Sequence, residues 1–461
     1  MSAVRITLED LFNLPSSEIV NPDDYKSISK ISIDSRKIKN GSLFIAIKGE
    51  KFDGHNFVRD VIKNGASAVV IERKKYSQFR DLDVPVILVD NSTEALGGLA
   101  KVWRSKLNAK VVSITGSAGK TTTKDMIGTL LSEKYKTKKT SGNNNNHIGV
   151  PLTILDANKN DEVLVLEHGT NHFGEIDYTA NIAQPDYALI TNIGNSHLEF
   201  LKNKRGVLKE KKSLFDVTAK RNGTLLINKD DKLLKNVYSD YKNKVTFGTE
   251  QRVDVKGKIL SYSEDGKPFV ELRYKGKTIK AHFNLYGEQN FKNFLAAASI
   301  AFKLGLSEKE ILNGMNKLSS PDKRLNVSEY SDFLLIDDTY NANPESMKAS
   351  IELLGRISLF KNKIAILGDM LELGNMELLY HKGLGSVIWK NKINIVYTIG
   401  TRMKELHKEL EDTGIETKHF LRRDALSEFL NDKDITDSVI LVKGSRGMKM
   451  EEFVTIIREK I

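Results

Sequence analysis

The 461-residue chain contains no cysteine. Disulfide bonds and thiolate metal sites are therefore excluded, and any metal ion must take oxygen or histidine ligands. Long apolar runs are also missing, because no segment approaches the ~18 residues of a membrane-spanning helix. The first residues, Met1 to Arg5, lack the basic and apolar regions of a secretory signal. We therefore expect a soluble, cytoplasmic protein without stable membrane insertion.

Basic residues are in excess, since 71 lysines and arginines oppose 60 acidic residues and give a formal charge of +11. Such an excess can indicate nucleic-acid binding, but the lysines are spread along the chain and few aromatic residues interleave with them. We therefore expect no nucleic-acid partner, and we interpret the charge as a solvated basic surface that favours anionic small substrates. A nucleic-acid-dependent ATPase is the alternative from a different class of function.

The chain is long enough for about three domains of ~150 residues each. Short apolar runs alternate with helical stretches, which is typical of α/β folds built on parallel sheets. The predicted domains are a small α/β domain at 1–105, a central domain with a parallel sheet at 106–320, and a Rossmann-like α/β domain at 321–461. A linker is expected at Ser319 to Asp322, before the third domain.

The predicted strands are apolar runs bounded by turns, and they lie at 31–33, 43–47, 68–71, 86–89, 111–115, 163–166, 187–191, 333–336, 364–367, 393–399 and 439–442. Helices are expected near 57–64, 94–107 and 289–304. Segment 251–285 differs, because its residues alternate around Asp265-Gly266 and Lys275-Gly276 turns. This pattern predicts antiparallel hairpins that extend one edge of the central sheet.

The most informative stretch begins at Val111, where an apolar strand breaks into a loop of small residues and then a helix. Gly116 and Gly119 allow several backbone N–H groups to face one anion, and Lys120 adds a positive charge. The hydroxyl of Thr121 can bind Mg²⁺. The Gly-x-x-Gly-Lys-Thr spacing is shorter than the usual phosphate-loop pattern. We interpret the stretch as a site for the phosphates of a nucleoside triphosphate.

Polar residues follow two further strands of the central domain. Glu167 comes directly after the run 163–166, and His197 lies in the glycine-bearing loop after 187–191. Ligands of parallel sheets bind beyond the carboxyl ends of the strands, so we expect both side chains to face the phosphate loop. A carboxylate at this place complements the Thr121 hydroxyl as a ligand of Mg²⁺.

Three polar turns lie between the strands of the first domain, at 34–36, 48–50 and 53–57. Each carries charged residues, and together they would gather these charges at one surface. Ordinary turn chemistry explains them equally well. The residues alone leave both interpretations open.

Taken in order, these motifs resemble those of the Mur ligases, a family of peptidoglycan synthesis, along all three domains. The resembling segments are 115–122, 142–151, 167–169, 192–199, 287–293, 337–344, 368–374 and 443–447. The resemblance implies an ATP-dependent ligase that passes the γ-phosphoryl group to a substrate carboxylate before an amine displaces phosphate. The blocks 338–344 and 368–374 imply UDP-N-acetylmuramoyl-tripeptide and D-alanyl-D-alanine as substrates. The alternatives are a sibling ligase that adds a single amino acid and a folylpolyglutamate synthetase-like ligase.

The resemblance also implies roles for individual residues around ATP and two Mg²⁺ ions. Lys120, Glu167, His197 and Lys211 would be catalytic, and the metal ligands would be Thr121, Glu167, His197 and a carbamylated Lys211. The position of Lys211 follows from alignment of the helix after the His197 loop. ATP would contact Thr115, Gly116, Ser117, Ala118, Gly119, Lys120, Thr121, Thr122, Asn290, Asn293, Arg324, Asp338, Tyr340 and Asn341. The third domain would bind the dipeptide and close over ATP.

For the acceptor, the resemblance implies that the polar surface of the first domain binds the uridine diphosphate end. The residues implied there are Ser35, Arg36, Lys48, Gly49, His55, Asn56 and Phe57. Asn143, Asn145, Asn146 and His147 resemble the loop that holds the sugar-peptide portion, because amides can pair with peptide groups. We expect the protein to act as a monomer.

Overall fold

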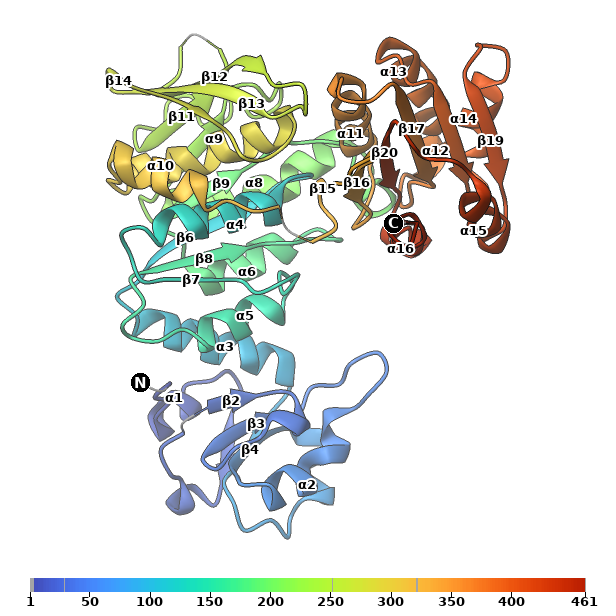
Figure 1. Cartoon of the computed structure of the whole chain (residues 1–461). Helices are drawn as coiled ribbons and strands as arrows, with labels where there is room; N and C mark the ends of the chain where they lie inside the picture. Colours follow the sequence, from blue (N-terminus) through green and yellow to red (C-terminus); the bar gives the residue numbers. More distant parts are fainter. Residues whose placement is uncertain (1–3, 29, 251, 321, 461) are drawn as a thin grey trace.

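The computed structural model describes residues 4–28, 30–250, 252–320 and 322–460. Pro321 of the expected linker, the first residue of segment 251–285 and Met1 to Ala3 lie outside the described residues. The chain forms three lobes, each with its own sheet, and the predicted three-domain α/β class is confirmed (Figure 1). In the described ranges no helix has both the length and the apolar character needed to cross a bilayer.

The N-terminal lobe contains a five-stranded sheet. Its elements are α1 (Leu8–Phe12), β1 (Glu18–Val20), η1 (Pro22–Asp24), β2 (Lys30–Ser32), η2 (Ser35–Lys37), β3 (Ser42–Ile45), η3 (Gly54–Phe57), α2 (Val58–Lys63), β4 (Ala66–Glu72), η4 (Arg73–Gln78) and β5 (Val86–Val89). The strand order is β1-β5-β4-β3-β2, and only the β1–β5 pairing is antiparallel. All four predicted strands are present, because their apolar runs are buried in the sheet.

Helix α3 (Ser92–Ser105) leads from this lobe into the nine-stranded central sheet. Its further elements are β6 (Lys110–Thr115), α4 (Lys120–Leu131), β7 (Thr137–Lys139), α5 (Gly149–Leu155), β8 (Val163–Glu167), α6 (Glu175–Ala183), β9 (Tyr187–Ile190), α7 (Leu198–Leu201), α8 (Lys204–Lys220), β10 (Thr224–Asn228), β11 (Lys244–Gly248), β12 (Val255–Tyr262), β13 (Pro268–Tyr274), β14 (Lys277–His282), α9 (Glu288–Lys303) and α10 (Glu308–Asn316). The strand order is β14-β13-β12-β11-β10-β9-β6-β8-β7. In this order, every neighbouring pair from β12 through β6 to β7 is parallel.

The antiparallel extension lies where it was predicted, at one edge of the central sheet. Strands β12, β13 and β14 pair antiparallel, and their turns hold Gly266 and Gly276 at φ of 88° and 78°. These left-handed conformations suit glycine, which has no Cβ to clash. Strands β7, β10 and β11 were not predicted.

The C-terminal lobe is a six-stranded sheet in the order β15-β16-β20-β17-β18-β19, parallel except for β15. Its elements are β15 (Asn326–Glu329), β16 (Phe333–Asp338), α11 (Pro344–Arg356), β17 (Asn362–Gly368), η5 (Gly374–Met376), α12 (Glu377–Lys382), α13 (Leu384–Lys390), β18 (Ile395–Ile399), α14 (Lys404–Leu410), β19 (Glu416–Phe420), α15 (Arg423–Asp432), β20 (Ser438–Lys443), η6 (Arg446–Met448) and α16 (Glu451–Arg458). The four strands predicted here are β16, β17, β18 and β20.

The site is positioned by β6, which lies between β8 and β9 in the central sheet. The three strands are parallel, so their carboxyl ends, at Thr115, Glu167 and Ile190, meet at one edge. Apolar residues of α4 and α9 pack together with these strands in one core. This packing fixes the N-terminal turn of α4, and hence the phosphate loop, relative to the strand ends.

Candidate active site

The phosphate loop between β6 and α4 depends on its two glycines. Gly116 and Gly119 have φ of 152° and 78°, which other residues rarely adopt. A Cβ on Gly116 would lie 1.9 Å from the hydroxyl oxygen of Thr191, and one on Gly119 would lie 2.4 Å from the side-chain oxygen of Asn293. Both positions therefore require glycine for conformation and for space.

The loop is held from the neighbouring strand end by residues that the sequence prediction did not assign. Thr191 donates its hydroxyl to the carbonyl of Ala118 at 2.6 Å, and Asn192 both accepts from the Ala118 N–H and donates to its carbonyl. Ser117 contacts Gly194 through the backbone N–H of Gly194, at 2.9 Å. The only sequence signal for this clamp was the run of polar residues after β9.

Lys120 is the first residue of α4, and its Nζ donates to the carbonyl of Gly116 at 2.8 Å. Burial of the ammonium lowers its pKa, an effect that the charge of Glu167 opposes and that of Arg324 reinforces. A cation held at the N-terminus of a helix faces the same space as the N–H groups of the first helical turn. The arrangement binds anions such as the phosphates of a nucleotide.

Glu167 at the end of β8 is buried, with 1% of its surface exposed. Its Oε1 accepts from the Thr121 hydroxyl at 3.0 Å and from the Asn145 side chain at 2.9 Å, whereas its Oε2 has no hydrogen-bond partner among the described residues. A buried carboxylate oxygen with no donor is suited to a cation. The predicted proximity of Glu167 to Thr121 is thus observed.

The next residue, His168, fastens the ends of β6 and β8 together. Its two ring nitrogens lie 2.9 Å from the hydroxyls of Thr179 and Ser113, and its carbonyl accepts from Thr115. Complete burial lowers the pKa of His168 to about 3, so the ring is neutral near pH 7.

This burial predicts a pH effect on stability. Between pH 6.5 and about 3 the unfolded chain binds a proton at His168 that the folded chain does not, so stability falls as the pH drops through this window. The slope from one such group is about 1.4 kcal/mol per pH unit. Urea unfolding of wild type and His168→Asn from pH 7 to 5 should show the wild-type advantage shrinking with falling pH. Parallel pH profiles of the two proteins would contradict this.

Lys211 lies on α8 with only 1% of its surface exposed. Desolvation lowers its pKa well below that of an ordinary lysine, and the charge of Lys120 lowers it further while Glu210 opposes the shift. Glu210 itself is buried and accepts the backbone N–H groups of Gly174 and Ile176, at 2.7 and 2.8 Å. Lys211 and Glu210 are thus buried, whereas the neighbouring Lys212 is half-buried and forms an ion pair with Asp216.

His197 has a left-handed backbone, with φ of 52°, and is the N-cap residue immediately before α7. Its Nδ1 lies 3.1 Å from the carboxylate of Glu372, which belongs to the C-terminal lobe. This close contact with His197 is the main cause that lowers the pKa of Glu372. Glu345, also of that lobe, accepts from the Asn195 backbone at 3.1 Å. Two carboxylates of the C-terminal lobe therefore contact the loop after β9, and neither was assigned from the sequence.

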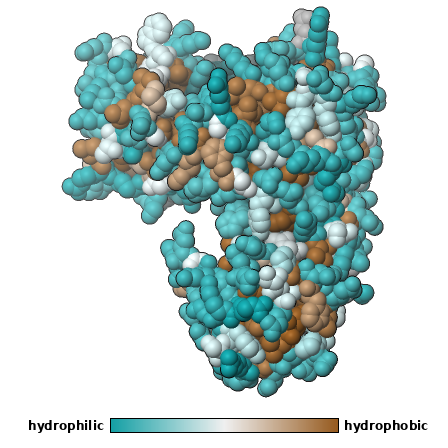
Figure 2. Space-filling model, turned by 180° about the vertical axis from the view of Figure 1, so that it is seen from behind, coloured by the Kyte–Doolittle hydropathy of each residue, from teal (hydrophilic) through white to brown (hydrophobic). Residues whose placement is uncertain are grey.

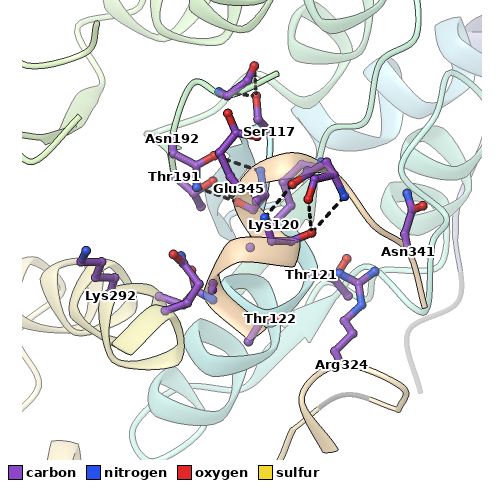
Figure 3. A pocket seen from close by; sticks show the side chains of 18 of the residues that line it. Ser117, Lys120, Thr121, Thr122, Thr191, Asn192, Lys292, Arg324, Asn341 and Glu345 are labelled. Carbon is purple, nitrogen blue, oxygen red and sulfur yellow. Dashed lines mark hydrogen bonds between the residues drawn. The ribbon is translucent and has the colours of Figure 1, made fainter. Parts of the chain in front are cut away.

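The third-lobe residues predicted for ATP form one connected group. Lys443, 1% exposed, donates to Asp338 at 2.5 Å and to the Asn341 carbonyl at 3.0 Å. The guanidinium of Arg324 lies 3.8 Å from the ring centre of Tyr340. In Figure 3, Arg324 and Asn341 are seen on the other side of Lys120 from Thr191 and Asn192.

A cavity of about 580 Å³ lies between the central and C-terminal lobes. It is lined by sixteen of the predicted residues: Ser117, Ala118, Gly119, Lys120, Thr121, Thr122, Asn143, Asn145, Glu167, His197, Asn290, Asn293, Arg324, Asp338, Tyr340 and Asn341. Thr115, Gly116 and Lys211 are not part of this lining, whereas Thr191 and Asn192 of the loop clamp are. Asn146 caps α5 by accepting from Ile148 and Gly149, and neither it nor His147 reaches the cavity wall.

The predicted acceptor residues of the first lobe lie away from this cavity, in turns that follow β2 and β3. Because β2 and β3 are parallel neighbours, these turns share one edge of the sheet. Arg36, Lys48, Gly49 and Asn56 are exposed there, whereas Ser35 and Phe57 are half-buried. His55 is buried, and its ring nitrogens contact Asp53 at 2.6 Å and the Glu72 N–H at 3.0 Å. His55 therefore supports the turn from inside.

Comparison with known proteins defines the class to which this fold and site belong. The Mur ligase middle domain matches residues 114–301, the Mur ligase glutamate ligase domain matches 323–446, and the Mur ligase family catalytic domain matches 27–104. The chain belongs to the Mur ligase family, which confirms the family predicted from its motifs.

Within the family, the chain is similar over nearly its full length to UDP-N-acetylmuramoyl-tripeptide–D-alanyl-D-alanine ligases. It is 37% identical to the UDP-N-acetylmuramoyl-tripeptide–D-alanyl-D-alanine ligase of Bacillus subtilis, with 98% of each chain covered. Among solved structures, MurF from Acinetobacter baumannii matches with a TM-score of 0.88 at 30% identity over the whole of both chains. MurF ligase from Thermotoga maritima in complex with ADP matches with a TM-score of 0.82 at 30% identity, covering 94% and 97% of the two chains.

Proposed function

We propose that this protein joins D-alanyl-D-alanine to UDP-N-acetylmuramoyl-tripeptide with consumption of ATP. The single observation that carries the proposal is the interlobe cavity, in which the phosphate loop and Glu167 of the central lobe face Arg324 and Asn341 of the C-terminal lobe. Relatives that share the full length of the chain bear this activity in their names. The product is the UDP-linked muramoyl pentapeptide, a precursor of peptidoglycan.

The proposed reaction has two steps. The tripeptide carboxylate attacks the γ-phosphorus of ATP, ADP leaves, and an acyl phosphate forms; the amine of the dipeptide then attacks the acyl carbon, loses a proton, and phosphate leaves. A free carboxylate is a poor electrophile, and phosphorylation supplies a good leaving group. The loop N–H groups and Lys120 hold the phosphates and offset the negative charge that accumulates in each step.

The donor set fits Mg²⁺, which usually takes one or two protein oxygens together with substrate phosphates and water. Thr121 and Glu167 would hold one ion, and Oε2 of Glu167, which accepts no hydrogen bond from the described residues, supports this assignment. His197 and a carbamylated Lys211 would hold the second. Among the described residues there is no group of three or more His, Asp or Glu side chains that could hold a metal ion. Substrate phosphates and water would therefore complete the ligand sets. When bound, Mg²⁺ would neutralise phosphate charge.

The proposed roles of the three lobes follow from the family resemblance. The exposed turns of residues 1–105 would bind the uridine diphosphate, and the loop at Asn143 to His147 would hold the sugar-peptide portion. Residues 106–320 would bind ATP, and residues 321–461 would bind the dipeptide and close over the nucleotide. Figure 2 shows a largely hydrophilic surface with a notch between the first and third lobes, which suits a long polar acceptor. A cytoplasmic monomer is part of this proposal.

The test is release of ADP from ATP and Mg²⁺ in the presence of both proposed substrates. We expect release that requires UDP-N-acetylmuramoyl-tripeptide and D-alanyl-D-alanine together, with a product heavier than the acceptor by one dipeptide less water. The acceptor is supplied with lysine or diaminopimelate as its third residue. Release with a single amino acid in place of the dipeptide would assign a sibling activity. Oligonucleotide-stimulated hydrolysis would refute the ligase function altogether.

A further inference from the structure

Lys124 is a buried lysine of the active-site region that the proposed chemistry does not use. It lies one helical turn after Lys120 on α4, with 1% of its surface exposed. Lysine is rarely buried to this extent unless its ammonium has polar partners. The position of this ammonium therefore calls for a reason beyond packing.

The partners of Lys124 come from two different segments. Its Nζ donates to the carbonyl of Gly142 at 3.3 Å and lies 3.9 Å from Oε2 of Glu167. A third neighbour, Asp125 at 3.6 Å, pairs more closely with Lys139, at 2.7 Å. Within the described part of the chain, Lys124 is the one cation that forms an ion pair with Glu167.

The loop that begins at Gly142 is tied to Glu167 by a second route. Asn145 of this loop donates its side-chain amide to Oε1 of Glu167, at 2.9 Å, and its carbonyl accepts the Gly169 N–H at 2.7 Å. A Cβ on Gly169 would lie 2.6 Å from the Asn145 side chain, so the loop packs closely on the end of β8. Lys124, Asn145 and Glu167 thus close a ring that joins α4, the loop and β8.

We propose that Lys124 is a positioning residue that fixes the acceptor loop, residues 142–147, and the Glu167 carboxylate in one arrangement. This inference rests on the proposed function, in which the loop holds the tripeptide and Glu167 serves the ATP side. One ammonium between the two segments sets the acceptor carboxylate relative to the γ-phosphate. Buried groups that orient a ligand in this way typically contribute about 10- to 100-fold to activity or metal affinity.

The main variant is Lys124→Met, which removes the charge and the donor while keeping most of the length and volume of the side chain. We expect kcat/KM for the UDP-tripeptide to fall about tenfold or more, and the Mg²⁺ concentration for half-maximal rate to rise, with KM for D-alanyl-D-alanine unchanged. The matched control is Lys139→Met, which removes the other lysine beside Asp125 but contacts neither Glu167 nor Gly142. The control should retain wild-type constants.

Lys124→Gln separates the two contacts, because glutamine keeps a donor for the Gly142 carbonyl and lacks the charge that faces Glu167. Hydrogen–deuterium exchange of segment 142–147 reads the order of the loop without turnover. We expect faster exchange of this segment in Lys124→Met, wild-type exchange in Lys139→Met, and an intermediate rate in Lys124→Gln. If Lys124→Met does not fold, the kinetic constants and the loop exchange are both measured on Lys124→Gln.

Equal kinetic constants and equal loop exchange in Lys124→Met and wild type would overturn the inference. A uniform loss of kcat with unchanged KM values and unchanged loop exchange would also overturn it, since that pattern marks a general structural role. Failure of the proposed function is seen separately, as absence of ADP release from wild type. In that case the loop-exchange comparison still decides whether Lys124 orders the loop.

Discussion

Replacement of Lys120 by methionine is expected to lower the rate of ADP release by about 10³-fold or more. Methionine keeps most of the length and volume of the side chain, so the phosphate loop should fold as before. The positive charge next to the transferred phosphoryl group is lost, however, and no other lysine takes its place on the first turn of α4. Steady-state ADP release with both substrates saturating measures the effect.

The control for this variant is Lys134→Met, which lies beyond the opposite end of α4 and donates to the Gly305 carbonyl. It should keep wild-type rates. Thermal unfolding of both variants should give midpoints close to that of wild type, because the Lys120 ammonium makes a single hydrogen bond to the described residues, to the Gly116 carbonyl. A Lys120→Met rate within tenfold of wild type would remove this residue from the catalytic group.

The phosphate loop could be predicted from the sequence because its requirements are local. Gly116 and Gly119 need special backbone conformations, and the lysine and threonine follow within the same turn, so spacing alone carries the information. The strands that flank it are continuous apolar runs, which is the strongest signal for buried parallel strands. The same reasoning placed Glu167 and His197 after the two strands that flank β6.

Contacts between lobes have no comparable local pattern in the sequence. Glu345 lies in a helix N-terminus and Glu372 in a loop, and nothing nearby in the sequence shows that they reach Asn195 and His197. Lys124 has no distinguishing pattern in the sequence, because its burial depends on contact with the distant loop at Gly142. Short edge strands such as β7 and β19 were also missed, since half-buried polar residues mask their periodicity.

Lys211 gives the second large expected effect. Its ammonium is buried and destabilised by desolvation and by Lys120, so the neutral amine is more populated than in an ordinary lysine. A neutral amine adds to CO₂ and releases a proton, which yields a carbamate anion suited to a cation. We expect Lys211→Ala to lose about 10²-fold or more in ADP release. Lys212→Ala, which removes the neighbouring half-buried lysine that pairs with Asp216, should remain active.

Further experiments distinguish a carbamylated Lys211 from an unmodified lysine. Wild type prepared without CO₂ should lose activity and regain it with bicarbonate, and ¹³C-bicarbonate should give a carbamate carbon signal that Lys211→Ala lacks. Added acetate should restore part of the activity of Lys211→Ala by supplying a carboxylate to the vacated space, whereas bicarbonate should not. If wild-type activity ignores CO₂ and no carbamate signal is seen, Lys211 acts as a buried amine. The second cation would then rely on His197 and the substrates for its ligands, because Glu210 is already engaged by the backbone of α6.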